Sequence, residues 1–395
     1  MSDCMKQPVI VSATRTPIGK FGGGLKDVGA TELGAIVVRE AVKRAKVPPS
    51  EVEECIMGNV LPAGLGQNPA RQAALRGGLS DEIPAMTINK VCGSGLKAVM
   101  LAADAVTLGR ESVVVAGGME SMTNAPYLLD KARFGYKLFD GKLVDSMVKD
   151  GLWDSFNDFH MGNTGEIVAE RHNISREEAD TFSIWSHQKS VNATKSGAFE
   201  KEMVPVEIKS RKGTVTVDRD EGPREDASPE SMGKLKPVFR DDGILTAGNS
   251  SSINDGASAV VVMDAERASG LGAEPLVRIV DHLSVGGKPE LLMEAPIAAV
   301  EKLLKRNNLK VGDVDLYEHN EAFSTASIAV MRILGIPEDR FNVNGGAVSL
   351  GHPIGCSGAR VLTTLIYAMD ARSSSRGIAT LCLGGGNAVA MLVER

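Results

Sequence analysis

The sequence lacks the cysteine and histidine spacings that are typical of metal sites and disulfide frameworks. None of its cysteines forms a C-x-x-C pair, and no histidines form an H-E-x-x-H pattern. An odd number of scattered cysteines argues against both a disulfide framework and a zinc site. We therefore expect free thiols, as in a reducing cytoplasm, at Cys4, Cys55, Cys92, Cys356 and Cys382.

Long apolar runs and an excess of positive charge are also missing. No apolar stretch is long enough to cross a membrane. The N-terminal segment MSDCMKQPVIVSATRTP has neither a secretory apolar core nor an Arg-rich leader, and the final LVER is not an organelle address. The formal net charge of -6 argues against a general nucleic-acid-binding protein, which is normally basic. We expect a cytoplasmic protein that binds no membrane and no nucleic acid.

Glycine, by contrast, is abundant. The chain has 43 glycines among 395 residues, whereas the usual share is about 7%. This abundance predicts many tight turns and close approaches between backbones. The length allows two or three domains with a large core.

The chain contains an internal repeat. Residues 38–59 (VREAVKRAKVPPSEVEECIMGN) and 300–320 (VEKLLKRNNLKVGDVDLYEHN) both predict an amphipathic helix, a turn and a strand that ends at asparagine. At nearly the same offset, segments starting at Ser94 and Ser357 both predict a helix, a turn, an apolar strand and glycines. Because helices and strands alternate, we expect two duplicated α/β halves with mostly parallel sheets covered by helices.

One stretch has no counterpart in the repeat. Residues 122–242 are more polar and contain both tryptophans and the charged segment KSRKGTVTVDRDEGPREDASPE. Such a stretch can be a plain surface insertion or a loop domain that covers a ligand. We predict an N-terminal half of residues 1–121 and 243–272, an inserted loop domain of residues 122–242, and a C-terminal half of residues 273–395.

Four reactive or polar side chains lie at the ends of repeated elements. If equivalent loops of the two halves meet, Cys92 before the helix SGLKAV lies near His352 in GGAVSLGHPIGCSGAR. The strands IATLCLGGG and VDLYEHNEAF bring Cys382 and Asn320 to the same region. A cysteine at a helix N-terminus is favoured as a thiolate.

Each of these residues also has a simpler explanation. Cys382 can pack in a core, His352 can lie in a turn, and Asn320 can cap the helix that follows it. Together, however, a nucleophile, a base, a second thiol and an amide form a set suited to acyl transfer.

Motifs along almost the whole chain closely resemble those of the thiolase family. In order, they are VIVSATRTPIGKFGG, GQNPARQAAL, VCGSGLKAV, VVAGGMESM, HMGNTGE, KLKPVF, AGNSSSINDGA, NEAF, GGAVSLGHPIGCSGAR and CLGGG. The CGSG motif, with His160 and Met161 in the insertion, is similar to the short-chain acetyl-CoA acetyltransferase branch. The resemblance implies the α/β thiolase fold, with two duplicated halves in a five-layer αβαβα sandwich and an inserted loop domain.

The resemblance implies a reversible Claisen condensation of two acetyl-CoA molecules to acetoacetyl-CoA and CoA through an acetyl-cysteine intermediate. By this resemblance, Cys92 carries the acetyl group, His352 takes its proton and Cys382 removes the α-proton. One oxyanion hole would use His352 and a water bound by Asn320. The other would use the backbone N–H groups of Cys92 and Gly384. No metal and no cofactor beyond the CoA-ester substrates is implied.

The resemblance also implies residues that bind coenzyme A. They are Leu152, His160, Met161, Arg224, Ser231, Phe239, Ala247, Ser251, Ala322 and Phe323. Arg224 lies in the charge run DRDEGPREDASPE and can equally be a solvated surface residue. The segment RFGYKLFDGK resembles the loop by which short-chain thiolases pair dimers, so a homotetramer is expected. The segment LLMEAPIAAV differs from the family pattern near the acyl pocket, which keeps a 3-ketoacyl-CoA thiolase of broader chain length, acting in fatty-acid degradation, as the alternative.

Three other functions fit parts of the sequence less well. Residues 93–98 match G-x-G-x-x-G/A, but a poor strand precedes them and no acidic residue ends the next strand. A condensing enzyme with a malonyl donor usually has histidine in place of Cys382. A non-catalytic subunit would not need the complete set of reactive residues.

Overall fold

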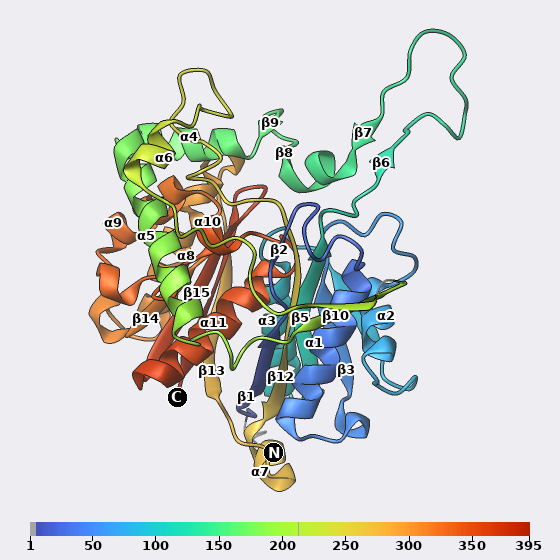
Figure 1. The fold of residues 1–395 in the computed structure, drawn as a ribbon. Helices are drawn as coiled ribbons and strands as arrows, with labels where there is room; N and C mark the ends of the chain where they lie inside the picture. Colours follow the sequence, from blue (N-terminus) through green and yellow to red (C-terminus); the bar gives the residue numbers. More distant parts are fainter. Residues whose placement is uncertain (1–4, 212) are drawn as a thin grey trace.

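Two halves of the chain are built from the same series of elements, as the internal repeat predicts. The computed structural model describes residues 5–211 and 213–395 (Figure 1). The first half contains β1 (Pro8–Arg15), α1 (Ala30–Ala45), β3 (Glu54–Gly58), α3 (Ser94–Thr107), β5 (Val113–Ser121) and β12 (Asn254–Asp264). The second contains β13 (Val277–Gly286), α8 (Ala295–Arg306), β14 (Leu316–His319), α11 (Ser357–Arg372), β15 (Arg376–Leu383) and β16 (Asn387–Glu394). The predicted duplication is confirmed.

Equivalent strands also hold equivalent positions in the sheet. The strand order is β3-β5-β12-β1 in the first half and β14-β15-β16-β13 in the second. The two parts are joined through a short antiparallel pairing between β1 and β13. An outer strand, β4 (Ala85–Ile88), extends the first part beside β3, whereas a single bridge between Tyr317 and Phe341 stands in its place in the second.

The expectation of mostly parallel sheets is wrong. In the described part of the chain, parallel pairing joins β3 to β4, β3 to β5 and β14 to β15, while the other pairings of the large sheet are antiparallel. One reason is the short length of the connection before β16, the last strand of the second half. β16 follows β15 after only three residues, and so short a connection can join only antiparallel strands. β12 holds the equivalent place beside β5.

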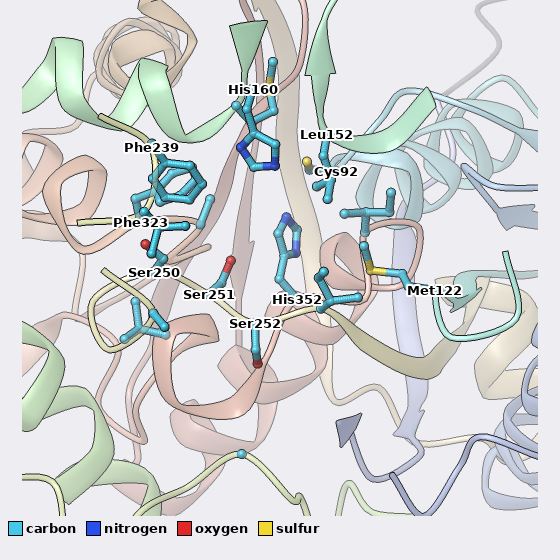
Figure 2. A pocket seen from close by; sticks show the side chains of 18 of the residues that line it. Cys92, Met122, Leu152, His160, Phe239, Ser250, Ser251, Ser252, Phe323 and His352 are labelled. Carbon is cyan, nitrogen blue, oxygen red and sulfur yellow. The ribbon is translucent and has the colours of Figure 1, made fainter. Parts of the chain in front are cut away.

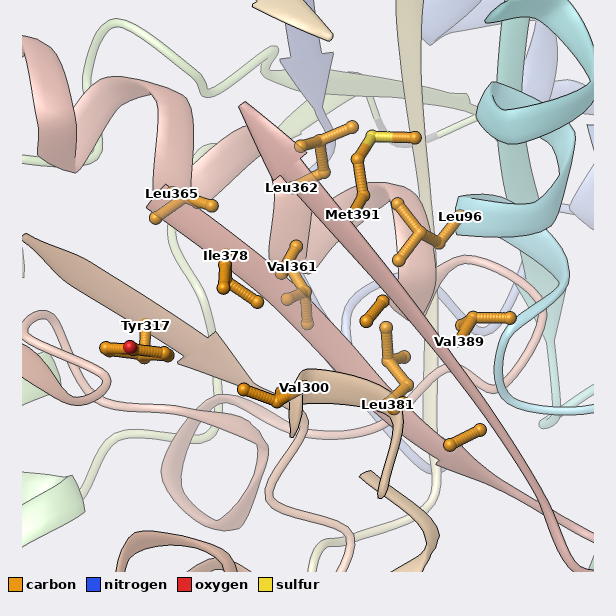
Figure 3. Packing of buried hydrophobic residues seen from close by; sticks show 14 of the residues in the cluster. Leu96, Val300, Tyr317, Val361, Leu362, Leu365, Ile378, Leu381, Val389 and Met391 are labelled. Atoms are coloured by element: carbon orange, nitrogen blue, oxygen red, sulfur yellow. The ribbon is translucent and has the colours of Figure 1, made fainter. Parts of the chain in front are cut away.

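The helices complete five layers, in agreement with the expected fold class. α1 and α2 (Pro69–Arg76) cover the outer face of the first sheet part. α3 and α11 lie between the two parts, and α8 with α9 (Ser324–Leu334) covers the far face of the second. In Figure 3, Leu96 of α3 and Leu362 of α11 pack in one apolar cluster with Val389 and Met391 of β16. The middle helices are buried on most sides because sheets cover them on both faces.

Glycines allow the two middle helices to touch at their N-termini. A Cβ atom on Gly95 of α3 would lie 2.7 Å from the backbone nitrogen of Ala359, and one on Gly358 of α11 would lie 2.3 Å from the nitrogen of Leu96. Both contacts are too short for any larger side chain. The repeated Ser-Gly pairs therefore mark the place where the two halves meet.

The insertion replaces a tight turn. It connects β5 to β12, where only three glycines connect β15 to β16. It contains β6 (Tyr127–Leu128), β7 (Val144–Asp145), the π-helical turn η2 (Met147–Leu152), β8 (Trp153–Asp154), β9 (Phe159–His160), α4 (Gly162–Arg171), α5 (Arg176–Lys195), β10 (Val206–Ser210), β11 (Gly213–Val217) and α6 (Pro229–Gly233). α4 and α5 pack on α9 of the second half, and the connection between β6 and β7 projects away from the body (Figure 1).

Short elements complete the chain. They are β2 (Gly19–Lys20), α7 (Ala265–Leu271), α10 (Ala347–Leu350) and the 3₁₀ turns Pro49–Glu51, Pro289–Glu294 (η3), Val311–Asp313 and Glu338–Arg340. No helix in the described ranges combines the length and the apolar character needed to cross a bilayer. The cysteines at 55, 92, 356 and 382 are free thiols, and Cys4 lies outside the described residues.

A buried ion cluster attaches the insertion to β1. The Arg15 guanidinium is fully buried, with its Nε 2.5 Å from Glu202 Oε1. Its two terminal nitrogens lie 2.7 and 2.9 Å from the carboxylate oxygens of Asp220. Because both acids belong to the insertion, this one side chain fixes two of its segments to the first half.

Replacing Arg15 with methionine should strongly destabilise the protein. The substitution leaves two carboxylates buried without their counter-ion, and breaking a buried ion pair in this way typically costs about 3–5 kcal/mol. Urea denaturation at one protein concentration measures the change in free energy of unfolding. The control is Lys43→Met, which removes an exposed pair with Glu40 and should cost no more than about 0.5 kcal/mol. Equal losses in the two variants would contradict a clamping role for Arg15.

Candidate functional site

One large cavity opens between the insertion and the meeting point of the two halves. Its volume is about 660 Å³, within the usual range for a small-molecule site. Of the residues that the sequence predicts for a site, its lining includes Cys92, Leu152, His160, Met161, Arg224, Phe239, Ala247, Ser251, Ala322, Phe323, His352, Cys382 and Gly384 (Figure 2). Asn320 lies directly behind this lining, and Ser231 lies away from it.

Cys92 follows a strained turn between β4 and α3. Val91 has a φ of +48°, a left-handed conformation that β-branched residues rarely adopt. The turn is held because the Val91 N–H donates to Asn89 Oδ1 and the Ser94 hydroxyl donates to the Val91 carbonyl. The Lys90 N–H donates to the same Ser94 oxygen. Strain of this kind typically costs about 1–3 kcal/mol and occurs most often at functional sites.

Glycines bring this turn against the last turn of the second half. A Cβ atom on Gly93 would lie 2.5 Å from Leu383, and one on Gly384 would lie 3.2 Å from Val91. The close approach directs the N–H groups of Gly384 and of Cys92 itself toward the Cys92 sulfur. These two donors could equally bind an oxygen atom that develops negative charge beside the sulfur.

Burial controls the protonation of the reactive pair. It raises the pKa of the Cys92 thiol to about 11, although the two N–H donors act in the opposite direction. It also lowers the pKa of the His352 imidazole to about 3. Desolvation of the sulfur therefore opposes the thiolate that the start of α3 favours, and the raised pKa reflects desolvation as the larger of the two effects. At neutral pH the pair is a thiol and a neutral imidazole.

Neighbouring side chains set the tautomer of His352. Its Nδ1 lies 2.6 Å from the Ser357 hydroxyl oxygen, and that hydroxyl donates to the Pro353 carbonyl at 2.9 Å. The hydroxyl has one hydrogen, so Nδ1–H is assigned as the donor to Ser357. Nε2 then carries a lone pair. A neutral imidazole with an unprotonated Nε2 can accept a proton from a thiol in the same cavity.

Asn320 lies beside that lone pair. It follows the end of β14 and is fully buried, with Nδ2 3.4 Å from His352 Nε2. Its Oδ1 has no hydrogen-bond partner within residues 5–211 and 213–395. The alternative that Asn320 caps the following helix is wrong, since α9 begins at Ser324 and Phe323 holds the cap position.

Cys382 is buried at the inner end of the cavity, near the end of β15. Burial and the neighbouring Cys92 raise the pKa of its thiol well above the usual value. Its sulfur lies 3.6 Å from Met293 Sδ. Met293 and Leu292 line the cavity, and both belong to η3 in the segment LLMEAPIAAV. In the sequence, the only indication of this wall was that LLMEAPIAAV differs from the thiolase family pattern.

Aromatic rings form the opposite wall. The His160 ring stacks on Phe239 with centroids 5.0 Å apart, and Phe239 meets Phe323 edge-on at 5.7 Å. Figure 2 shows these rings and His352 facing a common space near Cys92. Because the insertion supplies His160 and Phe239 and the second half supplies Phe323, the wall forms only when both are in place.

The outer end of the cavity is polar and contains residues that the motifs did not single out. The Arg224 backbone N–H donates to His187 Nδ1 at 3.2 Å, and its guanidinium pairs with Asp226. Burial, and then the charge of Arg224, lowers the pKa of His187 to about 4. Ser231 lies at the start of α6, where its hydroxyl donates to the backbone carbonyls of Asp226 and Ser228. Lys20 and Phe21, inside the quoted segment GKFGG, also line this end.

The described part of the chain shows no metal-binding cluster. No group of three or more His, Cys, Asp or Glu side chains there is arranged to hold an ion. The side chains that converge on the cavity are thiols, imidazoles and amides. Their chemistry suits covalent acyl transfer and proton transfer.

Comparisons with known proteins cover the whole architecture. The family model of the thiolase N-terminal domain matches residues 8–266, and that of the thiolase C-terminal domain matches residues 273–395. A probable acetyl-CoA acyltransferase of Staphylococcus aureus (strain COL) is 49% identical over 392 residues, which cover 99% of this chain and 100% of that protein. An acetyl-CoA acetyltransferase of Escherichia coli (strain K12) is 50% identical over the same length and coverage. The crystal structure of the Bacillus anthracis acetyl-CoA acetyltransferase is 42% identical, with a TM-score of 0.98 over 100% of both chains.

Proposed function

Because this chain belongs to the thiolase family, we propose that it catalyses the reversible condensation of two acetyl-CoA molecules to acetoacetyl-CoA and CoA. It is an acyltransferase, and its full-length relatives carry the names of acetyl-CoA acyl- and acetyltransferases. The observation that carries the proposal is the convergence of Cys92, His352 and Cys382 on one cavity beside Asn320. The CoA esters are the only small molecules that this chemistry needs.

In the first half-reaction, the Cys92 sulfur attacks the thioester carbonyl of acetyl-CoA. Its proton passes to the unprotonated Nε2 of His352, and the CoA thiolate leaves and takes up that proton. The products are acetyl-Cys92 and CoA. Because the thiol and the imidazole are both neutral at rest, the proton moves as the sulfur attacks, so that no isolated charge is buried.

In the second half-reaction, the Cys382 thiol gives its proton to His352 Nε2, and the resulting Cys382 thiolate removes an α-proton from a second acetyl-CoA. The resulting carbanion attacks the acetyl group on Cys92, a carbon–carbon bond forms, and the Cys92 sulfur leaves as a thiolate that takes the proton from the His352 imidazolium. Part of the raised pKa of Cys382 comes from its neighbour Cys92.

Two sets of donors would stabilise the negative charge on the thioester oxygens. One set is the pair of N–H groups of Cys92 and Gly384, which already converge beside the sulfur. The other is His352, which can donate from Nε2 once it has taken up a proton, with a water bound to Asn320, whose buried Oδ1 has no other hydrogen-bond partner among the described residues. Loss of one such donor typically costs about 2.7–4 kcal/mol in the activation barrier.

The acyl pocket should accept short chains only. Met161, Leu152 and Met293 line the cavity that holds the two thiols. Overfilling a packed site costs about 1–3 kcal/mol, which corresponds to roughly tenfold to a hundredfold in rate. We therefore expect kcat/KM for thiolysis of acetoacetyl-CoA to exceed that for 3-ketooctanoyl-CoA by at least this factor.

Met161→Ala should reduce this preference, because it removes volume from the wall. Met331→Ala, at a half-buried methionine that does not line the cavity, is the matched control and should leave the ratio of the two kcat/KM values unchanged. Comparable values for both substrates in the unaltered protein would favour the broader 3-ketoacyl-CoA thiolase. No thiolysis of either ester would refute the proposed function itself.

The remaining residues are proposed to bind the CoA arm. Leu152, His160, Met161, Phe239, Ala247, Ser251, Ala322 and Phe323 line the cavity between its two ends. Arg224 lines the outer end, and Ser231 supports the loop that carries Arg224 through its bond to the Asp226 carbonyl. In this proposal residues 122–242 act as the CoA-binding loop domain between residues 1–121 and 243–272 of one half and residues 273–395 of the other.

We also propose a cytoplasmic homotetramer. The free thiols suit a reducing compartment. The projecting segment of residues 133–142 exposes Phe134, Leu138 and Phe139, the last to 89%, and such a cluster usually marks a protein contact. Sedimentation analysis measures the mass of the assembly, and cell fractionation measures its location.

A further inference from the structure

The outer end of the cavity carries side chains that the acyl-transfer steps leave unused. Phe21 and Val238, each 58% exposed, line it, one from the turn after β2 and the other from the insertion. Lys20 of β2 lies next to Phe21 and is exposed. His352 and Cys382, at the inner end, are only 6% and 1% exposed. Exposure therefore increases from the thiols toward an opening lined by an aromatic ring and a cation.

The cation at this opening has no counter-ion. Arg224 pairs with Asp226, but the Lys20 ammonium has no carboxylate within 4 Å among the residues that the structure describes. The nearby Glu221 is occupied by backbone groups, since its oxygens accept the N–H groups of Lys20 and Gly24 at 2.7 and 2.9 Å. The charges of Lys20 and Arg224 both act on the His187 imidazole, so they lie at the same end of the cavity.

A rigid connection relates this opening to the reactive end. Lys20 pairs in the sheet with Asn254 of β12. The Asn254 side chain donates to the Gly19 carbonyl at 2.9 Å and accepts the backbone N–H of His352 at 3.0 Å. One buried amide thus holds both the strand that carries Lys20 and the backbone of His352. A ligand that reaches from the thiols to the opening would meet Lys20 at a fixed distance.

We propose that Lys20 and Phe21 bind the nucleotide end of the CoA ester, with the ammonium on its phosphate oxygens and the ring against its adenine base. This inference rests on the proposed function, because it takes a CoA ester as the ligand. CoA has a thioester at one end, an uncharged arm and an anionic nucleotide at the other end. The cavity has thiols at its inner end, an apolar middle and an unpaired cation beside an exposed ring at its opening. Phosphate oxygens suit an ammonium, and a flat base suits an aromatic face.

Calorimetric titration with CoA and with pantetheine, which lacks the nucleotide, tests this assignment. Lys20→Gln should weaken binding of CoA about tenfold at low salt and leave binding of pantetheine unchanged. Phe21→Leu, which keeps an apolar side chain but loses the ring, should weaken CoA binding about threefold and also spare pantetheine. Lys26→Gln is the matched control, because Lys26 is exposed on the same connection and does not line the cavity.

Two results would overturn the inference: unchanged binding of CoA to Lys20→Gln, or an equal loss for CoA and pantetheine. Dephospho-CoA then identifies the phosphate. If Lys20→Gln weakens binding of dephospho-CoA as much as it weakens binding of CoA, Lys20 contacts the diphosphate. If the substitution does not weaken binding of dephospho-CoA, Lys20 contacts the 3′-phosphate. Both results support the inference. Calorimetry needs no turnover, so its result is separate from the thiolysis assay. A protein that binds CoA through Lys20 but does not thiolyse acetoacetyl-CoA would contradict only the proposed reaction.

Discussion

Cys92→Ala should abolish both directions of the reaction, with a loss in kcat of more than about 10⁴-fold. The reason is that no other described thiol combines access to the cavity with the position of Cys92. Cys382 is buried against Met293, and Cys356 is buried away from the cavity lining. The measurement is the initial rate of acetoacetyl-CoA cleavage by CoA, together with the rate of the reverse condensation.

The same assignment predicts where the acetyl group is found. After brief incubation with acetyl-CoA and an acid quench, peptide mass analysis should find the added acetyl group on the peptide that contains Cys92. Cys356→Ala is the control, because it removes a buried thiol outside the cavity and should keep both activity and label. Acetyl found only on Cys382 or Cys356 would refute the assignment of Cys92 as the nucleophile.

Cys382→Ser should separate the two half-reactions. Acetylation of Cys92 does not need the second thiol, so the release of one CoA per site should stay within about tenfold of the normal rate. Condensation should fall by about 10²–10⁴-fold, the usual contribution of a positioned acid–base group. The physical reason is that a serine hydroxyl ionises far less readily than a thiol and is a poor substitute as the base.

Isotope exchange measures the second step directly. In heavy water, the unaltered protein should exchange the α-protons of acetyl-CoA, and Cys382→Ser should lose this exchange while it still acetylates Cys92. Cys356→Ser is the matched control, since it makes the same change at a buried thiol that does not line the cavity. A near-normal rate of condensation by Cys382→Ser would indicate that Cys382 only packs in the core.

The strained turn before Cys92 explains why so much of the site depends on small residues. Val91 keeps its left-handed φ only because Asn89 and Ser94 hold its N–H and its carbonyl. Gly93 leaves room for Leu383 from the second half. The CGSG and GGG motifs therefore make one contact between the two halves, and neither motif could make this contact without the other.

Sequence alone predicted the duplication, the alternation of helices and strands and the position of each reactive residue at the end of a repeated element, whereas the five-layer arrangement was implied by the resemblance to the thiolase family. These features depend on short-range signals: helix and strand periodicity, glycines in turns and the order of motifs along the chain. Equivalent elements also predicted that Cys92 and His352 would meet, since duplicated halves place equivalent loops at a shared boundary. The structure confirms that meeting in one cavity.

Only the tertiary structure decided the direction of the strands, the protonation of the reactive pair and the residues at the opening of the cavity. The sheets are mixed because β12 and β16 run antiparallel to their neighbours. Burial raises the pKa of the Cys92 thiol, against the effect of the helix start, because several distant segments pack around its sulfur. Lys20 and Phe21 join the cavity because β2 pairs with β12, more than two hundred residues away. The burial and the electrostatic environment of a residue depend on every segment that packs around it. A local sequence pattern therefore cannot predict them.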